Sequence, residues 1–287
     1  MKVLIASRWI GDGEPCVVVA EGGQNHSGAL NLALQMIRSA KAVGADAIKW
    51  QKRVPEISVP WQQNALRDTP WGALSYLDYR RKLELGRADY DAIDAECRTL
   101  GLPWSASPWD LPSLDFLLDY HPPFLKVASA CLTDHELLKV MAETGVPIIA
   151  STGMSTVEEI DRAVEILGTT NLILLHCQSC YPCPPEDLNL AAMLTLRDRY
   201  RVPVGLSDHT VGLWLSLCAV AMGACVIERH FTLNRSSFGT DQSSSVEPQG
   251  LRKLIEQIRR FESARGDGVI RVLPSEVPVR EKLRRCP

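Results

Sequence analysis

The 287-residue sequence lacks an apolar run long enough to span a bilayer, and Arg8, Asp12 and Glu14 interrupt the N-terminus too early for a signal peptide. It also lacks an excess of charge of either sign, because 31 Lys and Arg residues nearly balance 34 Asp and Glu residues. The resulting net charge of −3 provides no basic surface for nucleic acid and no cationic face for a membrane. We therefore expect a cytoplasmic protein that binds neither.

Three cysteines lie three residues apart beside a histidine in the stretch HCQSCYPCPPED, residues 176–187. A zinc or iron–sulfur site at Cys177, Cys180 and Cys183 would need a fourth ligand at a defined spacing, and none is evident. Free cysteine behaves in a protein core as a small hydrophobe, and reducing compartments keep thiols unpaired. We therefore expect free thiols here and look for the chemistry elsewhere.

Eight short apolar segments rich in Val and Ile recur along the whole chain, as is typical of fully buried parallel strands. They are residues 16–21, 46–51, 102–107, 124–129, 147–152, 171–177, 202–208 and 225–231. Segments of helical period separate them, which predicts an α/β fold, a single-domain (β/α)8 TIM barrel over residues 16–287. Residues 1–15 are expected to cap the bottom of this barrel. An open doubly wound sheet is the alternative, but the Gly-x-Gly-x-x-Gly turn after the first strand is missing.

Two details of the connections are also predicted. The helix after the fifth strand should begin with Ser155 as its N-cap, because Glu158 follows three residues later and completes a capping box. The connection over residues 52–88 is too long for an ordinary strand-to-helix loop, and we expect a lid or an interface segment. Its aromatic residues are Trp61, Trp71, Tyr76 and Tyr79.

Polar residues end the predicted strands, where the active site of such a barrel lies. Lys49 and Lys126 project from or near buried strands, and a buried lysine must be paired or lose its proton. One interpretation is a structural ion pair with Glu21. The other is an anion site, in which the ammonium groups and the hydroxyls of Ser151 and Ser207 surround a phosphate or carboxylate.

Two histidines end consecutive strands, so their imidazoles can face one point near the barrel axis. His209 and His230 are flanked by Asp208 and Glu228, and this set favours a divalent metal site. The carboxylates would either ligate the metal or orient the imidazoles. The residues by themselves thus predict a metal-assisted enzyme that acts on a small anion.

The motifs also occur, in order, in a known family. VVVAEGGQNHSGALNLALQMIRSAKAVGADAIKWQ resembles the opening of the N-acetylneuraminate (sialic acid) synthase family. FLKVASACLTDHELL, STGMSTVEEIDRAV, LLHCQSCYPCPPEDLNL, VPVGLSDHTVG, VIERHFTL and GTDQSSSVEP continue the similarity through LPSEVPVREKLRR. The resemblance covers nearly the whole chain.

The resemblance implies a reaction and a set of roles. The family condenses phosphoenolpyruvate with an aldose to form a 3-deoxy-2-ulosonic acid and phosphate, in a homodimer that uses a divalent metal, most often Mn²⁺, with Mg²⁺ or Co²⁺ as alternatives. By this similarity His209 and His230 would bind the metal, and Glu21 would be an acid/base or water-positioning group. The phosphoenolpyruvate would contact Lys49, Ser107, Lys126, Ser129, Ser151 and Ser207. The acceptor sugar would contact Gln51, Ser179, Tyr181 and Asp241.

The sequence departs from the family pattern at three places. Cys131 stands where the family has an acidic residue, so a candidate catalytic position carries a thiol that would need a strongly lowered pKa to transfer protons at neutral pH. The usual Gly-Pro-Asp-His is Gly239-Thr240-Asp241-Gln242, which keeps the aspartate and loses the histidine. The sequence ends at residue 287, and by the resemblance the small C-terminal antifreeze-like domain of the family is expected to be absent.

Three hypotheses of function therefore stand. The leading one is a phosphoenolpyruvate-dependent synthase that forms a C–C bond to an aldose or another aldehyde-bearing sugar derivative, with an acceptor other than N-acetylmannosamine or a substitute cover from residues 52–88. The second is a metal-dependent aldolase or lyase on the same barrel. The third is a non-catalytic or regulatory homologue of a sialic acid synthase.

Overall fold

The computed structural model describes residues 1–60 and 65–286, so Trp61 lies outside the described residues. Within that range, eight parallel strands form one sheet in the order β7-β4-β3-β12-β11-β10-β9-β8. They are β3 (Val17–Gly23), β4 (Ala47–Lys52), β7 (Trp104–Pro108), β8 (Leu125–Val127), β9 (Ile148–Ser151), β10 (Leu172–Cys177), β11 (Val204–Asp208) and β12 (Val226–His230). Each coincides with a predicted strand.

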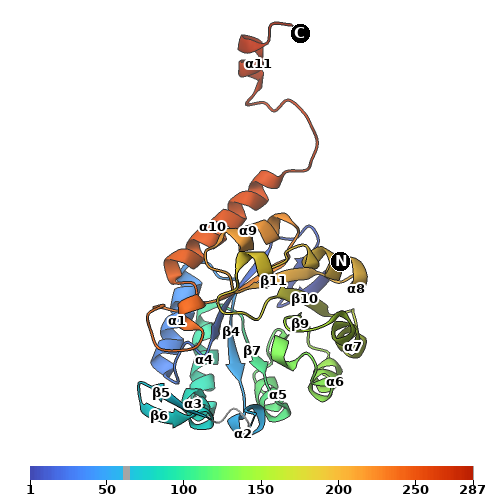
Figure 1. Ribbon diagram of the computed structural model, residues 1–287. Helices are drawn as coiled ribbons and strands as arrows, with labels where there is room; N and C mark the ends of the chain where they lie inside the picture. The colour runs from blue at the N-terminus through green and yellow to red at the C-terminus, as the bar shows by residue number, and fades with distance from the viewer. Residues whose placement is uncertain (61–64, 287) are drawn as a thin grey trace.

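The sheet curls into a nearly closed barrel, because its two outermost strands meet. The Ser105 hydroxyl of β7 donates a hydrogen bond of 2.5 Å to the carbonyl of Phe124, which directly precedes β8. Helices follow the strands on the outside (Figure 1). They are α1 (Leu30–Ala42), α4 (Arg87–Leu100), α5 (Leu111–Leu118), α6 (His135–Glu143), α7 (Val157–Leu167), α8 (Ala192–Tyr200), α9 (Trp214–Ala221) and α10 (Pro248–Arg265). The predicted (β/α)8 barrel is confirmed, and the doubly wound sheet is excluded.

Apolar side chains fill the space between strands and helices, and a second, smaller cluster lies at the amino ends of the strands. There the antiparallel hairpin β1 (Lys2–Ile5) and β2 (Arg8–Gly11) buries Val3, Ile5 and Ile10 against residues such as Val19 and Ile173. This packing covers the end of the barrel opposite the strand ends that carry the polar residues.

The capping box of α7 is one residue later than predicted. Thr156 is the N-cap; its hydroxyl accepts a hydrogen bond from the Glu159 amide at 3.3 Å, and Glu159 accepts one from the Thr156 amide at 2.7 Å. The Ser155 hydroxyl instead donates to the carbonyl of Gly153, which keeps Ser155 in the loop.

The long connection after β4 contains α2 (Pro55–Ser58), the hairpin β5 (Leu66–Thr69) and β6 (Gly72–Ser75), and α3 (Tyr76–Leu83). Its aromatic rings pack against Phe238, in the loop that follows β12: the ring centroids of Trp71 and Tyr79 lie 6.5 and 6.1 Å from that of Phe238. The connection after the second barrel strand therefore contacts the loop after the eighth, at the carboxyl ends of the strands.

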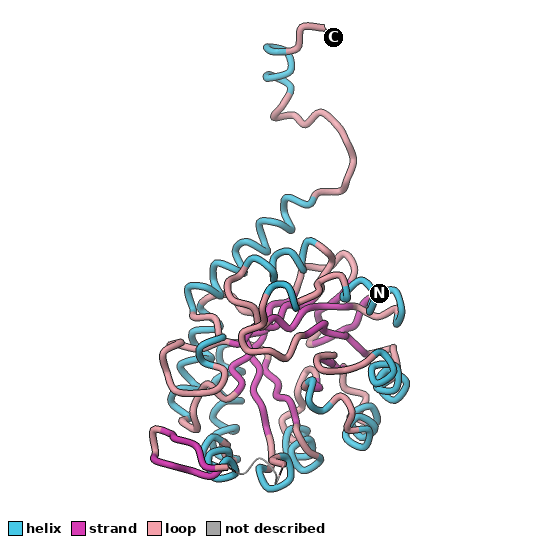
Figure 2. Tube along the Cα trace, viewed as in Figure 1, coloured by secondary structure: helices cyan, strands magenta, loops and turns pink. Residues whose placement is uncertain are grey.

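The C-terminal part differs from the expectation that the barrel extends to residue 287. The last barrel helix, α10, ends at Arg265, and residues 266–286 are exposed, with the short helix α11 (Val277–Leu283). Figure 2 shows this arm leading away from the barrel. None of the helices in the described ranges combines the length and the apolarity that crossing a membrane requires.

Candidate active site

The carboxyl ends of the strands surround a cavity of about 220 Å³. The sequence-predicted residues in its lining are Glu21, Lys49, Gln51, Ser107, Lys126, Ser129, Ser151, Ser179, Tyr181, Ser207, His209 and His230. Trp109 and Met154 also line it and were not predicted. Trp109 follows β7 directly, so the rule that strand ends form the site would have found it. Met154 lies in a loop, and no pattern in the sequence indicates its position.

Lys49 and Glu21 form a buried ion pair on the neighbouring strands β4 and β3. The Lys49 Nζ lies 2.5 Å from Glu21 Oε2 and donates a hydrogen bond of 3.0 Å to the Ser107 hydroxyl. Glu228 Oε2 lies 3.9 Å from the same Nζ. The ion pair considered from the sequence is therefore present, and the same ammonium group also faces the cavity.

Lys126 has a second set of partners across the cavity. Its Nζ donates to the Ser151 hydroxyl at 2.6 Å and to the carbonyl of Val127 at 2.9 Å, and lies 3.8 Å from Glu228 Oε1. The Ser207 hydroxyl donates to the same Glu228 oxygen at 3.0 Å. Two ammonium groups and several hydroxyls thus converge on one small cavity.

The two carboxyl groups between these lysines have pKa values that are pushed apart. Burial, together with the negative charge of Glu228, raises the pKa of Glu21 to about 7, and Lys49 opposes this shift. Burial also disfavours the ionised form of Glu228, but Lys126 and Lys49 outweigh it and hold its pKa at about 2. Carboxyl groups with separated pKa values are typical of acid/base sites. Glu21 is therefore the candidate proton-transfer group, and Glu228 is a permanent counter-charge.

His209 and His230 come together as predicted from their strand ends, with ring centroids 5.3 Å apart. The Nδ1 of His209 lies 2.6 Å from the carbonyl of Gln178 and must donate to it, so Nε2 carries the lone pair when the ring is neutral. Although burial opposes them, Cys177 and this carbonyl raise the pKa of His209. The Nδ1 of His230 is buried without a hydrogen-bond partner. Burial lowers the pKa of His230 to about 4, so this ring is neutral at neutral pH.

These two imidazoles have the chemistry of metal ligands: both offer lone pairs, and one is oriented by a backbone carbonyl. The nearest carboxylate to His230 Nδ1 is that of Asp241, at 3.8 Å. Within residues 1–60 and 65–286, no group of three His, Cys, Asp or Glu side chains is arranged to hold a metal ion. His209 and His230 are therefore two candidate ligands, and binding of a divalent cation by them stays a prediction.

Asp208 and Glu228, expected to ligate the metal or to orient the imidazoles, contact other residues instead. Side chains alternate along a strand, so Ser207 and His209 face the barrel interior while Asp208 faces outward. There Asp208 pairs with Arg229 at 2.5 Å and accepts a hydrogen bond from the Thr210 amide at 2.8 Å. Asp208 therefore neither ligates a metal nor orients these imidazoles, and Glu228 faces inward but contacts the lysines.

Asp241 is absent from the cavity lining but reaches its rim. Gly23 has a left-handed backbone (φ +53°), and a β-carbon there would lie 3.2 Å from Glu21 Oε1, 3.5 Å from Gln51 Nε2 and 3.7 Å from Asp241 Oδ2. These three side chains therefore surround one point, which only a glycine leaves open. Gln51 Nε2 donates to Glu21 Oε1 at 3.4 Å and links the rim to the buried ion pair.

Cys131, predicted as a catalytic position, lies outside the cavity lining. Ser129 and Ala130 face the cavity, whereas Cys131 is buried in the apolar core at the end of the same short 3-10 turn. Burial raises the pKa of its thiol to about 12, so the thiol stays neutral at physiological pH. It cannot replace the family carboxylate in proton transfer.

The cysteines of residues 176–187 are free thiols in three different environments. Cys177 lines the cavity, Cys180 is exposed, and the Cys183 thiol donates to the carbonyl of Pro184. The stretch borders the site through Ser179 and Tyr181. The ring of Tyr181 packs 4.1 Å, centroid to centroid, from that of His209.

Comparisons with known proteins agree with this fold. Residues 36–270 match the NeuB family. An uncharacterised protein of Methanocaldococcus jannaschii is 38% identical over 287 residues, covering 99% of this chain and 82% of that protein. The N,N'-diacetyllegionaminic acid synthase of Legionella pneumophila is 35% identical, covering 96% of this chain and 80% of the synthase.

Among solved structures, an N-acetylneuraminic acid (sialic acid) synthetase from Leptospira borgpetersenii in complex with citrate is 33% identical, with a TM-score of 0.87. The match covers 100% of this chain and 98% of that one. The resemblance to sialic acid synthases that the sequence motifs indicate is thus confirmed, and the chain belongs to the NeuB family.

Proposed function

We propose that this protein condenses phosphoenolpyruvate with an aldose, or another aldehyde-bearing sugar derivative, to form a 3-deoxy-2-ulosonic acid and phosphate. The observation that carries the proposal is the pair Lys49 and Lys126, buried in one cavity whose lining also includes five serines. Ammonium groups and hydroxyls are matched to a phosphate and a carboxylate. The related Leptospira synthetase was solved with citrate, a polycarboxylate, which supports an anion-binding role.

Substrate binding would rearrange the charges of the free site. A phosphate or carboxylate beside Lys49 and Lys126 competes with Glu21 and Glu228 for the same ammonium protons. Because the pKa of Glu21 is already raised to about 7, this carboxyl is the one that changes its protonation at small cost. Glu228 stays ionised, and its charge opposes the lowering of the lysine pKa values by burial.

The reaction then balances with one water molecule. Carbon 3 of phosphoenolpyruvate attacks the aldehyde carbon, and the aldehyde oxygen takes a proton. Water adds to carbon 2 and gives up one proton through the Glu21 carboxylate, the candidate base, to the aldehyde oxygen. Its second proton leaves with the phosphate as the C–O bond breaks to give the 2-keto acid. By the resemblance, Gln51, Asp241, Ser179 and Tyr181 would contact the sugar.

A divalent cation, Mn²⁺ by the resemblance and Mg²⁺ or Co²⁺ as alternatives, is part of the proposal. His209 and His230 would hold it, and when bound it supplies a Lewis acid for the aldehyde oxygen or for water. The homodimer and the cytoplasmic location expected from the sequence stay predictions.

The test is to incubate the purified protein with Mn²⁺, phosphoenolpyruvate and a panel of aldoses, and to measure aldose-dependent phosphate release together with the keto-acid product. Stoichiometric release supports the proposal. Cleavage of 3-deoxy-2-ulosonic acids without phosphate would favour an aldolase or lyase, and tight phosphoenolpyruvate binding without turnover would favour a non-catalytic homologue. Failure to bind phosphoenolpyruvate at all would rule the proposal out.

A further inference from the structure

We propose that Arg53 is a positioning residue, which fixes the side-chain amide of Gln51 so that its NH₂ group, and not its carbonyl, faces Glu21 and the sugar side of the cavity. The inference rests on the proposed function for its catalytic consequence, but its structural content can be tested without turnover.

The chemistry of the two side chains determines the orientation. An arginine nitrogen can only donate, so the Gln51 atom that contacts the Arg53 Nη2 must be the carbonyl oxygen, Oε1. The amide nitrogen then points the opposite way, and Nε2 donates to Glu21 Oε1 at 3.4 Å. Without Arg53 either end of the amide could face Glu21 when that carboxyl is protonated, because a carboxylic acid both donates and accepts.

Arg53 is itself buried and has contacts on several sides. It is only 3% exposed, and its guanidinium lies over the ring of Trp109, 3.9 Å from the ring centroid. Its Nε lies 3.4 Å from Glu84 Oε1, and its backbone amide donates to Glu84 Oε2 at 3.3 Å. Trp109 lines the cavity, so the stacked guanidinium lies directly behind the cavity wall.

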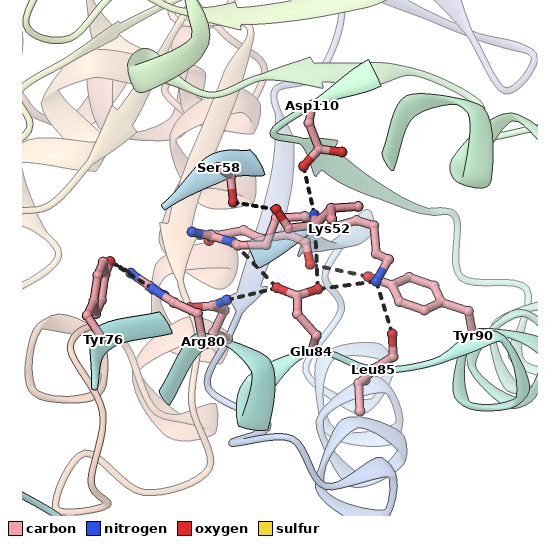
Figure 3. A network of polar contacts seen from close by, with 12 residues as sticks. Lys52, Ser58, Tyr76, Arg80, Glu84, Leu85, Tyr90 and Asp110 are labelled. Carbon is pink, nitrogen blue, oxygen red and sulfur yellow. Dashed lines mark hydrogen bonds and ion pairs between the residues drawn. The ribbon is translucent and has the colours of Figure 1, made fainter. Parts of the chain in front are cut away.

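Glu84 joins the two ends of the long connection after β4. Besides Arg53, it accepts hydrogen bonds from Lys52 Nζ at 3.3 Å and from Gln24 Nε2 at 3.4 Å. Figure 3 shows Glu84 at the centre of this network, with Lys52 on one side and Asp110, which accepts from the Val54 amide, above it. Residues at both ends of the connection, Arg53 and Glu84, thus support Gln51.

A donor at this position sets a requirement for the acceptor sugar. Gln51 Nε2 lies beside Gly23 and Asp241, the point that the missing β-carbon leaves open. The sugar therefore has to present an oxygen that accepts a hydrogen bond there, such as a carbonyl or a hydroxyl oxygen. Loss of this fixed donor should weaken binding of the sugar and leave the phosphoenolpyruvate contacts of Lys49 and Lys126 in place.

The experiment compares Arg53→Met with Lys52→Met as the matched control. Lys52 shares Glu84, but its Nζ otherwise contacts the Leu85 carbonyl and the rings of Tyr90 and Phe116. The Tyr90 hydroxyl donates to the Gln51 backbone carbonyl at 3.2 Å, so this control removes none of the hydrogen bonds described for the Gln51 side-chain amide. Arg53→Met removes the hydrogen bond from the charged guanidinium to Gln51 Oε1, and the aldose KM should rise about tenfold as a result. The phosphoenolpyruvate Kd should stay within about twofold. Arg53→Met combined with Gln51→Ala should be no worse than Gln51→Ala alone.

The second readout is the side-chain NH₂ signal of Gln51 in ¹⁵N-labelled protein, identified by its loss in Gln51→Ala. It should shift in Arg53→Met and stay in place in Lys52→Met. An unmoved signal, a phosphoenolpyruvate Kd that weakens as much as the aldose KM, or additive effects in the double variant would overturn the proposal. If the wild-type protein turns over no aldose but the signal still shifts, the positioning of Gln51 stands and the synthase proposal fails.

Discussion

The Nζ of Lys49 lies 2.5 Å from Oε2 of Glu21, and both side chains are almost completely buried at the ends of adjacent parallel strands. The pair links anion binding to proton transfer, because an anion that contacts Lys49 takes the place of the carboxylate that neutralises it.

Replacing Glu21 by Gln should separate binding from chemistry. Gln keeps the shape and removes the base, so we expect kcat to fall by about 10²-fold or more. The phosphoenolpyruvate Kd should stay equal or become tighter, because Lys49 loses its internal competitor. Steady-state kinetics and calorimetric titration measure the two quantities; a variant with nearly normal kcat would show that the base is another residue.

The pH dependence of the reaction should carry the signature of Glu21. Its pKa is raised to about 7 in the free protein, so the ionised base is lost as the pH falls below that value. The value of kcat/KM should therefore decrease about tenfold per pH unit on the acidic side of pH 7. This decrease at acidic pH should be absent from the residual activity of Glu21→Gln. If the variant still shows the decrease, a different group causes it.

Replacing Cys131 by Ala should affect stability and leave catalysis alone. The thiol is neutral, because burial raises its pKa to about 12, and it lies outside the cavity lining. We expect kcat within about twofold of the wild type and a loss of about 1–2 kcal/mol in the free energy of unfolding, for the small cavity created. Denaturant unfolding and kinetics test this; a 10²-fold loss of kcat with a normal fold would restore Cys131 to the mechanism.

Breaking the outward-facing pair of Asp208 and Arg229 should destabilise the barrel. Both side chains are buried, and Asp208→Ala would leave the guanidinium without its carboxylate. The expected loss is about 3–5 kcal/mol in the free energy of unfolding. Urea denaturation measures it, and Mn²⁺ affinity in the folded variant serves as the control: a specific loss of metal binding would mean that Asp208 does orient the histidines.

Removal of either imidazole should weaken binding of the proposed metal. We expect His209→Ala and His230→Ala to lose Mn²⁺ affinity by at least about tenfold, since each would remove one of two protein ligands. Electron paramagnetic resonance of free Mn²⁺ gives the affinity without any need for turnover. Unchanged affinity in both variants would place the ion elsewhere.

Much of the architecture can be predicted from local pattern. Eight buried apolar segments separated by helical periods can satisfy their backbone hydrogen bonds and cover both faces of the sheet in few ways, and the barrel is one of them. The same reasoning places strand-end residues such as Lys49, Lys126 and His209 around one cavity, because the carboxyl ends of parallel strands meet at one end of the barrel. Ser155 and Thr156 are each followed three residues later by a glutamate, so the sequence pattern alone does not decide which of them caps the helix.

The sequence by itself determined the barrel, the family and the end of the barrel at which the polar residues gather, because these depend on residue type, period and order along the chain. Alternation along the strands already separates Glu228, two residues before His230, from Asp208, directly before His209. Only the tertiary structure decided their partners: Glu228 meets the two buried lysines, and Asp208 meets Arg229. It likewise placed Cys131 in the core and brought Glu84, 31 residues away, against Arg53. Contacts of this kind depend on the path of the long connection, and no local pattern encodes that path.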